Sequence, residues 1–454
     1  MAFFLEEIDA TILTTSLPQM ARSLGVGTPR MSLAISGYLA SVAIMLPVSG
    51  WLADRFGARR VYCTALGIFA GGSVLCGAAP SLPLLLVGRA VQGMGAAWMN
   101  ATGRLIVVRS VPKERLIVAT NYMIAPAQLG SLLGPVVGGA ITTYFSWRWN
   151  FLINVPLALI AIAASLAKVP AVAPERTRPF DWRGFALLSA ALVALQFIVR
   201  ARGSAAAAQL FFLALPLLLL AAYVWHARRC AHPLVDLTLL ATRTVRTTVL
   251  IGGVSRIASG ALPFVLPLLL QLGFGLDPLH SGALTVAVTL GAFVSRAGAG
   301  AAMRRLTLRT LLMLNALMLA ALLAGLTRFS PASPHSWLFL YLLLLGFLRS
   351  VQFSTLTALG YADLDSSQLS HATTLIALAS RCFMSSGVIL AAALLATLAG
   401  SHTPSLADFA TVLLSLAALM ASSALGFAQL RRGDGWQLSD QRARIARSGP
   451  GAAR

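Results

Sequence analysis

The feature that most constrains this chain is a series of apolar runs, each about 17 to 25 residues long, separated by short gaps that carry arginine. Runs of this length match an α-helix that crosses about 30 Å of hydrocarbon. Backbone groups in lipid must be paired within the protein, so the runs are predicted to be helices. The ten-residue alternation typical of transmembrane barrels is absent. The sequence therefore predicts an all-α polytopic membrane protein.

Composition agrees with this class, because 57% of the residues are hydrophobic and only 11% are charged, with a mean hydropathy of +0.80. A soluble domain carries about a quarter charged residues. The pattern predicts about fourteen spans, at residues 2–20, 31–52, 61–79, 82–108, 117–144, 150–167, 184–199, 210–226, 247–272, 281–302, 309–326, 336–361, 371–399 and 406–428.

Lysine and arginine are unevenly divided between the two sides of the predicted membrane. The tail and the gaps after even-numbered spans hold 23 of them, whereas the opposite gaps hold six. The positive-inside rule then places both termini in the cytoplasm of a multi-pass protein, which we expect in the bacterial inner membrane. The net charge of +21 is thus explained by topology, and no nucleic-acid partner is needed. Residues 429–454 are predicted to be a disordered, basic cytoplasmic tail.

No set of residues typical of a cofactor, metal or catalytic site is visible. The four cysteines and six histidines are scattered without a C-x-x-C pair or an H-E-x-x-H motif. A phosphate-binding loop is also missing, so we expect neither a cofactor, a metal, nor enzymatic or ATPase activity. If the protein moves a solute uphill, an ion gradient must supply the energy.

Three acids lie inside an apolar run, and all three are near the N-terminus: Glu6, Glu7 and Asp9. At 1.5 Å per residue, a helix that starts at the interface places Asp9 near half depth, with Glu6 one turn away on the same face. Desolvation opposes ionisation there, so such an acid can bind and release a proton. Asp9 is our first candidate for the proton carrier, followed by Glu6 and Glu7. The alternative is that the three acids cap a frayed helix in water.

Six arginines also lie within predicted spans, where each needs a carboxylate, a carbonyl group or a water-filled cavity. Arg104, Arg296 and Arg349 are expected to extend from helix ends to the interface. Arg256 and Arg381, together with Gln271, are candidates for lining a substrate cavity. The remaining arginine, Arg89, falls in the fourth span.

The gaps after spans 2 and 10 both place a glycine-containing helix end before a basic cluster. This weak repeat predicts two six-helix bundles, at residues 1–167 and 247–428, joined by a linker with two inserted transmembrane helices at 168–246.

Four motifs in order resemble the major facilitator superfamily, and in particular its fourteen-span drug:proton antiporter group. They are Asp9-Ala-Thr11 with Leu17-Pro18 in span 1, motif A (Gly50, Asp54, Arg55, Gly57, Arg59, Arg60), motif B (Arg89, Gln92, Gly93) and motif C (Gly130, Gly134, Pro135, Gly138, Gly139). The resemblance covers nearly the whole chain, with Asn121 and Ala58 as departures from motifs C and A. It implies the major facilitator fold, electrostatic coupling of Arg89 to Asp9 in proton relay, and a multidrug transporter.

Motifs A and C also have a physical interpretation that does not depend on the family resemblance. Acid and base at the helix end of motif A can form a gate, or simply a tight turn with topogenic charges. The motif C glycines permit close helix contact and Pro135 allows a bend. Together these features predict a proton-coupled antiporter that exports small amphipathic compounds or drugs by alternating access. The alternatives are export of an organic anion or its metal chelate, and a non-transporting sensor or scaffold. We expect a monomer in the lipid bilayer, whose partners are protons and its substrate, with a periplasmic adaptor protein as a further candidate.

Overall fold

A computed structural model describes residues 1–110, 116–169, 179–197, 206–230, 233–305, 307–365, 368–400 and 402–431. Within these ranges the chain forms helices and no strand, and each predicted span coincides with a helix. The first half contains α1 (Ala2–Ile12), η1 (Thr14–Ser16), α2 (Leu17–Ser23), η2 (Thr28–Met31), α3 (Ser32–Phe56), α4 (Ala58–Gly77), α5 (Leu82–Ser110), α6 (Leu116–Tyr144), α7 (Trp149–Leu152) and α8 (Asn154–Lys168). The tail predicted at 429–454 lies outside the described residues from 432 onward.

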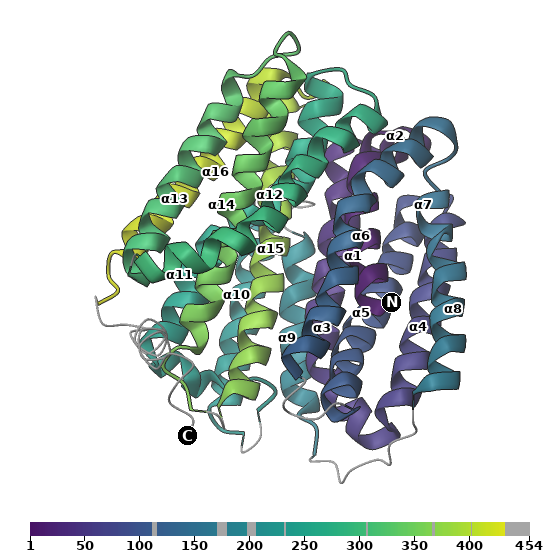
Figure 1. Ribbon diagram of the computed structural model, residues 1–454, viewed down its shortest axis with the longest axis vertical. Helices are drawn as coiled ribbons and strands as arrows, with labels where there is room; N and C mark the ends of the chain where they lie inside the picture. Colours follow the sequence, from purple (N-terminus) through teal and green to yellow (C-terminus); the bar gives the residue numbers. More distant parts are fainter. Residues whose placement is uncertain are drawn as a thin grey trace, which may run out of the picture.

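The remainder contains the insert helices α9 (Trp182–Gln196) and α10 (Ala206–Ala227), then η5 (Leu237–Ala241), α11 (Arg243–Leu268), the π-helical turn η6 (Leu269–Gly273), α12 (Pro278–Arg305), α13 (Leu308–Gly325), η7 (Leu326–Arg328), α14 (His335–Tyr361), α15 (Leu369–Ala399) and α16 (Leu406–Phe427). Figure 1 shows the helices before α9 gathered on one side and those after α10 on the other.

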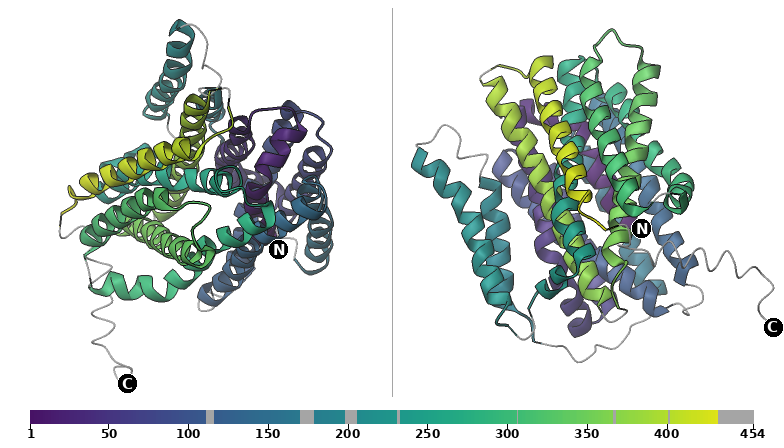
Figure 2. Two further views of the ribbon diagram at one scale, coloured as in Figure 1. Left: turned by 90° about the horizontal axis from the view of Figure 1, so that it is seen from above. Right: turned by 90° about the vertical axis from the view of Figure 1, so that its left-hand side faces the viewer.

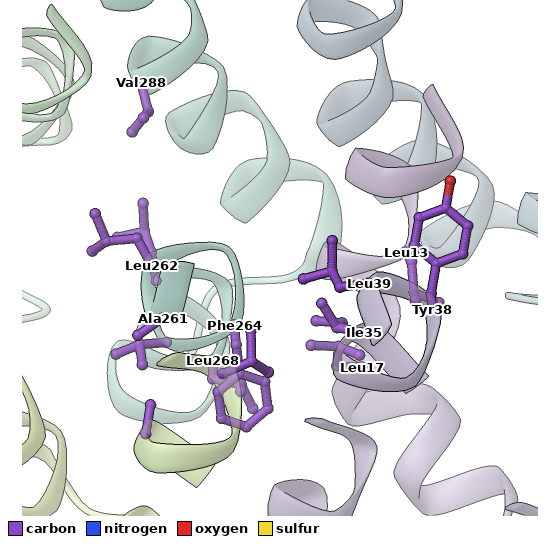
Figure 3. Close-up of a cluster of buried hydrophobic side chains, with 14 of the residues drawn as sticks. Leu13, Leu17, Ile35, Tyr38, Leu39, Ala261, Leu262, Phe264, Leu268 and Val288 are labelled. Atoms are coloured by element: carbon purple, nitrogen blue, oxygen red, sulfur yellow. The ribbon is translucent and has the colours of Figure 1, made fainter. Parts of the chain in front are cut away.

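The two sides meet along two seams, in which α3 packs against α15 and α6 packs against α12. The core is continuous across the seams, and Figure 3 shows Ile35 and Leu39 of α3 on one side and Phe264 and Leu268 of α11 on the other. Hydrogen bonds add to this contact, because Ser385 donates to the Ser36 carbonyl oxygen at 3.1 Å. Ile35, Leu39 and Leu268 lie in the half of the bundle that the arginine distribution predicts to be extracytoplasmic, so the two sides are in contact there.

The insert helices α9 and α10 pack on each other at the periphery of the bundle (Figure 2). Aromatic side chains attach the insert to α3. The ring of Trp51 of α3 contacts those of Phe180 and Trp182, with centroid distances of 5.7 and 5.8 Å. At the other end of α9, Ser36 donates a hydrogen bond of 2.7 Å to Gln196. The insert therefore docks mainly on α3.

Ten helices in the described part of the chain are long and apolar enough to cross a membrane. The predicted spans that fall outside this set are α5, α9, α10 and the first segment, in which α1 gives way to the 3-10 turn η1 and then to α2. In the first segment the three acids lower the hydropathy, and α9 has only 15 residues. A total of fourteen spans therefore stays a prediction.

Candidate functional site

The centre of the N-terminal side of the bundle holds an ion pair that is closed off from solvent. Arg89 of α5 donates through Nη1 to Oδ2 of Asp9 on α1 at 2.7 Å, and the two side chains are 1% and 0% exposed. The two residues predicted to couple electrostatically are thus in direct contact. A pair this deeply buried is stable only if its remaining donors and acceptors are also matched.

Neighbouring amides supply that matching. Oδ1 of Asp9 accepts hydrogen bonds from Gln92 at 3.1 Å and from Asn154 of α8 at 2.9 Å. Gln92 also accepts from Arg89 at 2.8 Å and donates to Ser73 of α4 at 2.7 Å. The network therefore connects four helices through one carboxylate, and it joins motif B to the acid of the first span.

The guanidinium of Arg89 has further partners on α3. Its Nε donates to the Ala34 carbonyl oxygen at 3.0 Å, and its central carbon lies 4.2 Å from the centroid of the Tyr38 ring. Gly93 lets α5 approach this closely, because a Cβ there would lie 2.8 Å from the Tyr38 carbonyl oxygen. The positive charge remains stabilised by a ring and two oxygens even if Asp9 is neutral.

One turn before Asp9, Glu6 forms a second ion pair, which crosses between the two sides of the bundle. Its Oε1 accepts from Nη2 of Arg381 on α15 at 3.0 Å, and its Oε2 accepts from Asn100 of α5. Glu6 is 5% exposed whereas Arg381 is 33% exposed. The pair therefore links the buried network to a more open region next to α15.

Glu7 faces in another direction. It lines a cavity of about 380 Å³ between α6, α12 and α14, whose other polar lining residues include Gln128, Ser131 and Thr289. No hydrogen bond or ion pair of its carboxylate is found among the described residues. The three acids of α1 are thus divided: Asp9 lies within the N-terminal side, Glu6 crosses to α15, and Glu7 lies at the α6–α12 seam.

Motif A occupies the turn between α3 and α4. Gly57 adopts a φ of 86°, which a residue with a side chain rarely adopts. This conformation turns the chain between the end of α3 at Phe56 and the start of α4 at Ala58. The Arg55 guanidinium lies 5.1 Å from the Trp51 ring, and Arg59 and Arg60 begin α4. Gly50 and Asp54 line a cavity of about 1200 Å³ with the insert and His371 of α15.

Motif C holds α1 against α6. A Cβ on Gly130 would lie 2.6 Å from the Phe4 carbonyl oxygen, and one on Gly134 or Gly138 would overlap Thr11 or the Ile12 carbonyl oxygen. Gly139 faces α12 instead, at the carbonyl oxygen of Pro278, and the Pro135 carbonyl oxygen lies against Gly282 of α12. The motif therefore determines the position of α1 and brings α6 into contact with the other side.

The residues predicted to line a substrate cavity occupy different environments. Gln271 of η6 contacts the first segment, where it donates to the Thr15 carbonyl oxygen of η1 at 2.7 Å and accepts from Gln19 of α2 at 3.3 Å. Arg381 is the partner of Glu6. Arg256 is 3% exposed inside the C-terminal side, where its Nη1 donates to the Thr248 carbonyl oxygen at 2.8 Å. Of these three residues, Arg381 alone is partly open.

A cluster that the sequence spacing did not suggest lies where α9 begins and α10 ends. Ligand atoms of Asp181, His226 and Cys230 all lie within 4.8 Å of one another. Asp181 caps α9 by accepting from Gly184 at 2.8 Å, and it also accepts from Leu234 and contacts His226. Burial opposes its charged form, but these hydrogen bonds outweigh burial and lower the pKa of Asp181. Its capping role explains the contact without an ion.

Comparison with known proteins now identifies the family. The model of the Major Facilitator Superfamily matches residues 1–384. The chain belongs to the Major Facilitator Superfamily. It is 36% identical to the "Putative multidrug resistance protein MdtD" of Klebsiella pneumoniae over 94% of this chain and 92% of that protein. It is 35% identical to the protein of that name in Escherichia coli, over 88% of this chain and 85% of the relative.

Its fold is similar to that of solved transporters of the Major Facilitator Superfamily. A crystal structure of a mutant of the nucleoside transporter NupG has a TM-score of 0.69 at 13% identity and covers 94% of this chain and 97% of NupG. The protein is therefore a multi-pass membrane transporter of the Major Facilitator Superfamily.

Within this superfamily fold, sequence reasoning missed several residues of the site. Asn154, Ser73, Tyr38 and Asn100 all contact the acids, Arg89 or Gln92. Their only signal in the sequence is a polar or aromatic side chain inside an apolar helix, which many packing residues share. Their contacts with the acids and with motif B are visible only in the assembled helices.

Proposed function

We propose that this transporter is a proton-coupled antiporter that exports small amphipathic compounds or drugs by alternating access. One arrangement carries the proposal: the buried pair Asp9–Arg89 and the crossing pair Glu6–Arg381 lie one turn apart on α1. Two carboxylates in the membrane, each held by an arginine, can exchange a proton for a change in helix contacts.

The proposed cycle starts from the conformation in which the two sides are in contact in the half predicted to be extracytoplasmic. Protonation of Glu6 weakens its hold on Arg381 and so releases a contact between the two sides of the bundle. Protonation of Asp9 leaves Arg89 with the Ala34 carbonyl oxygen, Gln92 and the Tyr38 ring. The protonated and the ionised forms of these two carboxylates thus favour different helix arrangements, which is the requirement for coupling proton binding to movement of the helices.

Two glycine-rich motifs give the change of contacts a structural basis. Motif C positions α1, with its acids, directly on α6, and α6 in turn contacts α12 of the other side. Motif A lies at the cavity between α3, the insert and α15, where relative movement of the two sides changes the cavity's shape. We therefore assign motif A to gating and motif C to transmission of movement from α1 to the seam.

The energy available is sufficient for concentrative export. One elementary charge moving through 100 mV supplies about 2.3 kcal/mol, and each tenfold proton gradient adds about 1.4 kcal/mol. In this proposal the transporter works in the bacterial inner membrane with both termini in the cytoplasm. The positive-inside distribution of lysine and arginine supports that orientation.

Proton flux in liposomes tests the proposal directly. Purified protein is reconstituted with a pH-sensitive dye inside, a pH gradient is imposed, and either ethidium or benzoate is added. We expect at least one of the two probes to dissipate the gradient with the wild-type protein. Asp9→Asn should abolish this flux, and Glu6→Gln should reduce it.

The matched control is Asp408→Asn, because Asp408 is a partly exposed acid that caps α16 outside the buried network. Gel-filtration profiles are compared so that equal amounts of folded protein are assayed. Proton flux that persists unchanged in Asp9→Asn would contradict the proposed carrier. If no probe moves protons in any variant, the sensor or scaffold interpretation is favoured.

A further inference from the structure

The described part of the chain contains one buried arginine whose surroundings are incomplete. Arg256 of α11 is 3% exposed, and its Nη1 donates to the Thr248 carbonyl oxygen. Among the described residues, its Nε and Nη2 have no hydrogen-bond acceptor. A guanidinium stays charged at any physiological pH, and leaving a buried charge unpaired is among the costliest arrangements in a protein.

Arg89 shows what a fully matched arginine looks like in the same molecule. It is 1% exposed, and it has a carboxylate, a backbone carbonyl, an amide oxygen and a ring at 4.2 Å as partners. Within the described ranges, the one hydrogen-bond acceptor of Arg256 is the carbonyl of Thr248, and its one ring contact is Phe353, whose centroid lies 5.8 Å from the guanidinium carbon. Burial alone therefore does not explain the missing partners of Arg256.

The described residues do not supply the counter-charge in this conformation. The three acids within the predicted spans all lie on α1, where Asp9 pairs with Arg89 and Glu6 with Arg381. The third acid, Glu7, lines the cavity between α6, α12 and α14. An anion from outside the chain is therefore the natural match for Arg256.

The geometry of the unpaired atoms restricts what that anion can be. Nε and Nη2 are on the same edge of the guanidinium, and their N–H groups point in parallel. Two oxygens bound to one atom, as in a carboxylate or a sulfonate, accept both bonds at once. A single point acceptor such as chloride uses this edge less well.

Two further unpaired donors lie on α14, the helix that faces Arg256. Gln352 Nε2 and Thr355 Oγ1 are buried without a hydrogen-bond partner in the part of the chain that the structure describes, while the Gln352 oxygen already accepts from Asn315 at 2.8 Å. On the same helix, Phe353 is 51% exposed and thus offers an apolar surface next to the guanidinium. The helix that carries these two unpaired donors therefore also contributes the ring next to the guanidinium.

We propose that Arg256 is the anion-binding residue of a substrate subsite between α11 and α14, which takes the carboxylate or sulfonate of an amphipathic organic acid. The inference rests on the proposed transport function and specifies its substrate class. Gly252 leaves room for the guanidinium itself, because a Cβ there would lie 3.0 Å from Arg256 Nη1 and 3.1 Å from the Leu356 side chain. The edge of the guanidinium that carries Nε and Nη2 is buried in this conformation, so the ligand enters when α14 moves relative to α11.

Binding of benzoate to the full-length protein in detergent tests the inference, with uncharged benzamide as the isosteric comparison. We expect saturable binding of labelled benzoate, a rise in melting temperature with benzoate or benzenesulfonate, and neither effect with benzamide. Arg256→Lys keeps the charge but loses the fork, so affinity should fall roughly tenfold or more. Arg148→Lys is the matched control, since Arg148 also has a carbonyl partner and an aromatic ring.

An internal counter-charge gives a second, independent test. The Leu356 side chain approaches the space beside Arg256, so Leu356→Glu should raise the melting temperature without ligand and remove the response to benzoate. This variant keeps the inference testable if Arg256 variants fold poorly. Equal binding of benzoate and benzamide, or unchanged benzoate affinity in Arg256→Lys, would overturn the inference.

Two further experiments distinguish a lipid headgroup from a free organic acid as the ligand, and anion binding from proton coupling. If phosphatidylglycerol alone gives an Arg256-dependent stabilisation and benzoate adds none, the site binds lipid and the substrate assignment is wrong. Benzoate binding in detergent requires no gradient, so it should persist in Asp9→Asn. Proton flux that persists in Asp9→Asn, with benzoate binding intact, would thus contradict only the choice of Asp9 as carrier, and intact proton flux in the wild-type protein without benzoate binding would contradict only the subsite.

Discussion

The buried pair of Asp9 and Arg89 permits a quantitative prediction about stability. Asp9→Asn removes the negative charge but leaves the guanidinium of Arg89 buried at 1% exposure. Breaking a buried pair in this way costs about 3–5 kcal/mol. In Arg89→Gln the carboxylate of Asp9 keeps the amide donors of Gln92 and Asn154, so we expect a smaller cost of about 1–3 kcal/mol.

The double variant distinguishes pairing from two separate packing effects. With both charges removed, no unpaired ion remains, so the double variant should be less destabilised than the sum of the single variants by about 2–3 kcal/mol. The measurement is the folded fraction in mixed micelles of increasing denaturing detergent, at fixed lipid content. As a control, Asp408→Asn combined with Arg89→Gln should be additive within about 0.5 kcal/mol, because Asp408 belongs to the cap of α16 and shares no hydrogen-bond partner with Arg89 among the described residues.

A coupling energy below about 0.5 kcal/mol for the Asp9 and Arg89 variants would refute this reasoning. It would mean that the two side chains do not depend on each other for stability, although they lie 2.7 Å apart. The electrostatic basis of the proposed proton coupling would then lose its support, because neutralising Asp9 would leave Arg89 unaffected.

Two further predictions concern parts of the fold that support the site. Gly134→Val should destabilise the protein by about 1–3 kcal/mol in the same detergent titration, because a side chain there overlaps Thr11. The control Gly50→Ala should not change the stability, since no atom lies within 4 Å of the Cβ position of Gly50. Equal effects of the two substitutions would refute the motif C contact. Asp181→Asn should lower the melting temperature at neutral pH. The difference should persist down to about pH 4, the usual pKa of an aspartate, and should shrink below it as the pH falls through the lowered pKa of Asp181, because the carboxylate stabilises the fold only while it is ionised. A difference that is independent of pH would contradict the capping role.

Much of the architecture could be predicted from the sequence because helix formation in a membrane is a local property. Run length and the need for internal hydrogen bonds predict each helix without knowledge of its neighbours. All fourteen predicted spans coincide with helices, although the first is interrupted by η1 after Ile12. That interruption was not predicted, because α1, η1 and α2 all lie within one apolar run.

The site depended on which helix faces meet, and that is decided by packing. Asp9 and Arg89 are 80 residues apart in the chain, and Glu6 and Arg381 are 375 apart. The acids and arginines could be identified as costly residues that need partners, yet the partners follow from the close contacts that glycines such as Gly130 and Gly93 allow.

The sequence by itself determined the class of the protein, the position of its helices and the residues that are too costly in lipid to be incidental. The family resemblance implied the coupling of Asp9 with Arg89, whereas the tertiary structure decided how the other charges are matched and which are not. It brought Asp181 and His226 together at the ends of α9 and α10, and among the described residues it left two nitrogens of Arg256 unpaired. The physical reason is that hydrophobicity acts on each segment separately, whereas the pairing of a buried charge depends on the geometry of several helices at once.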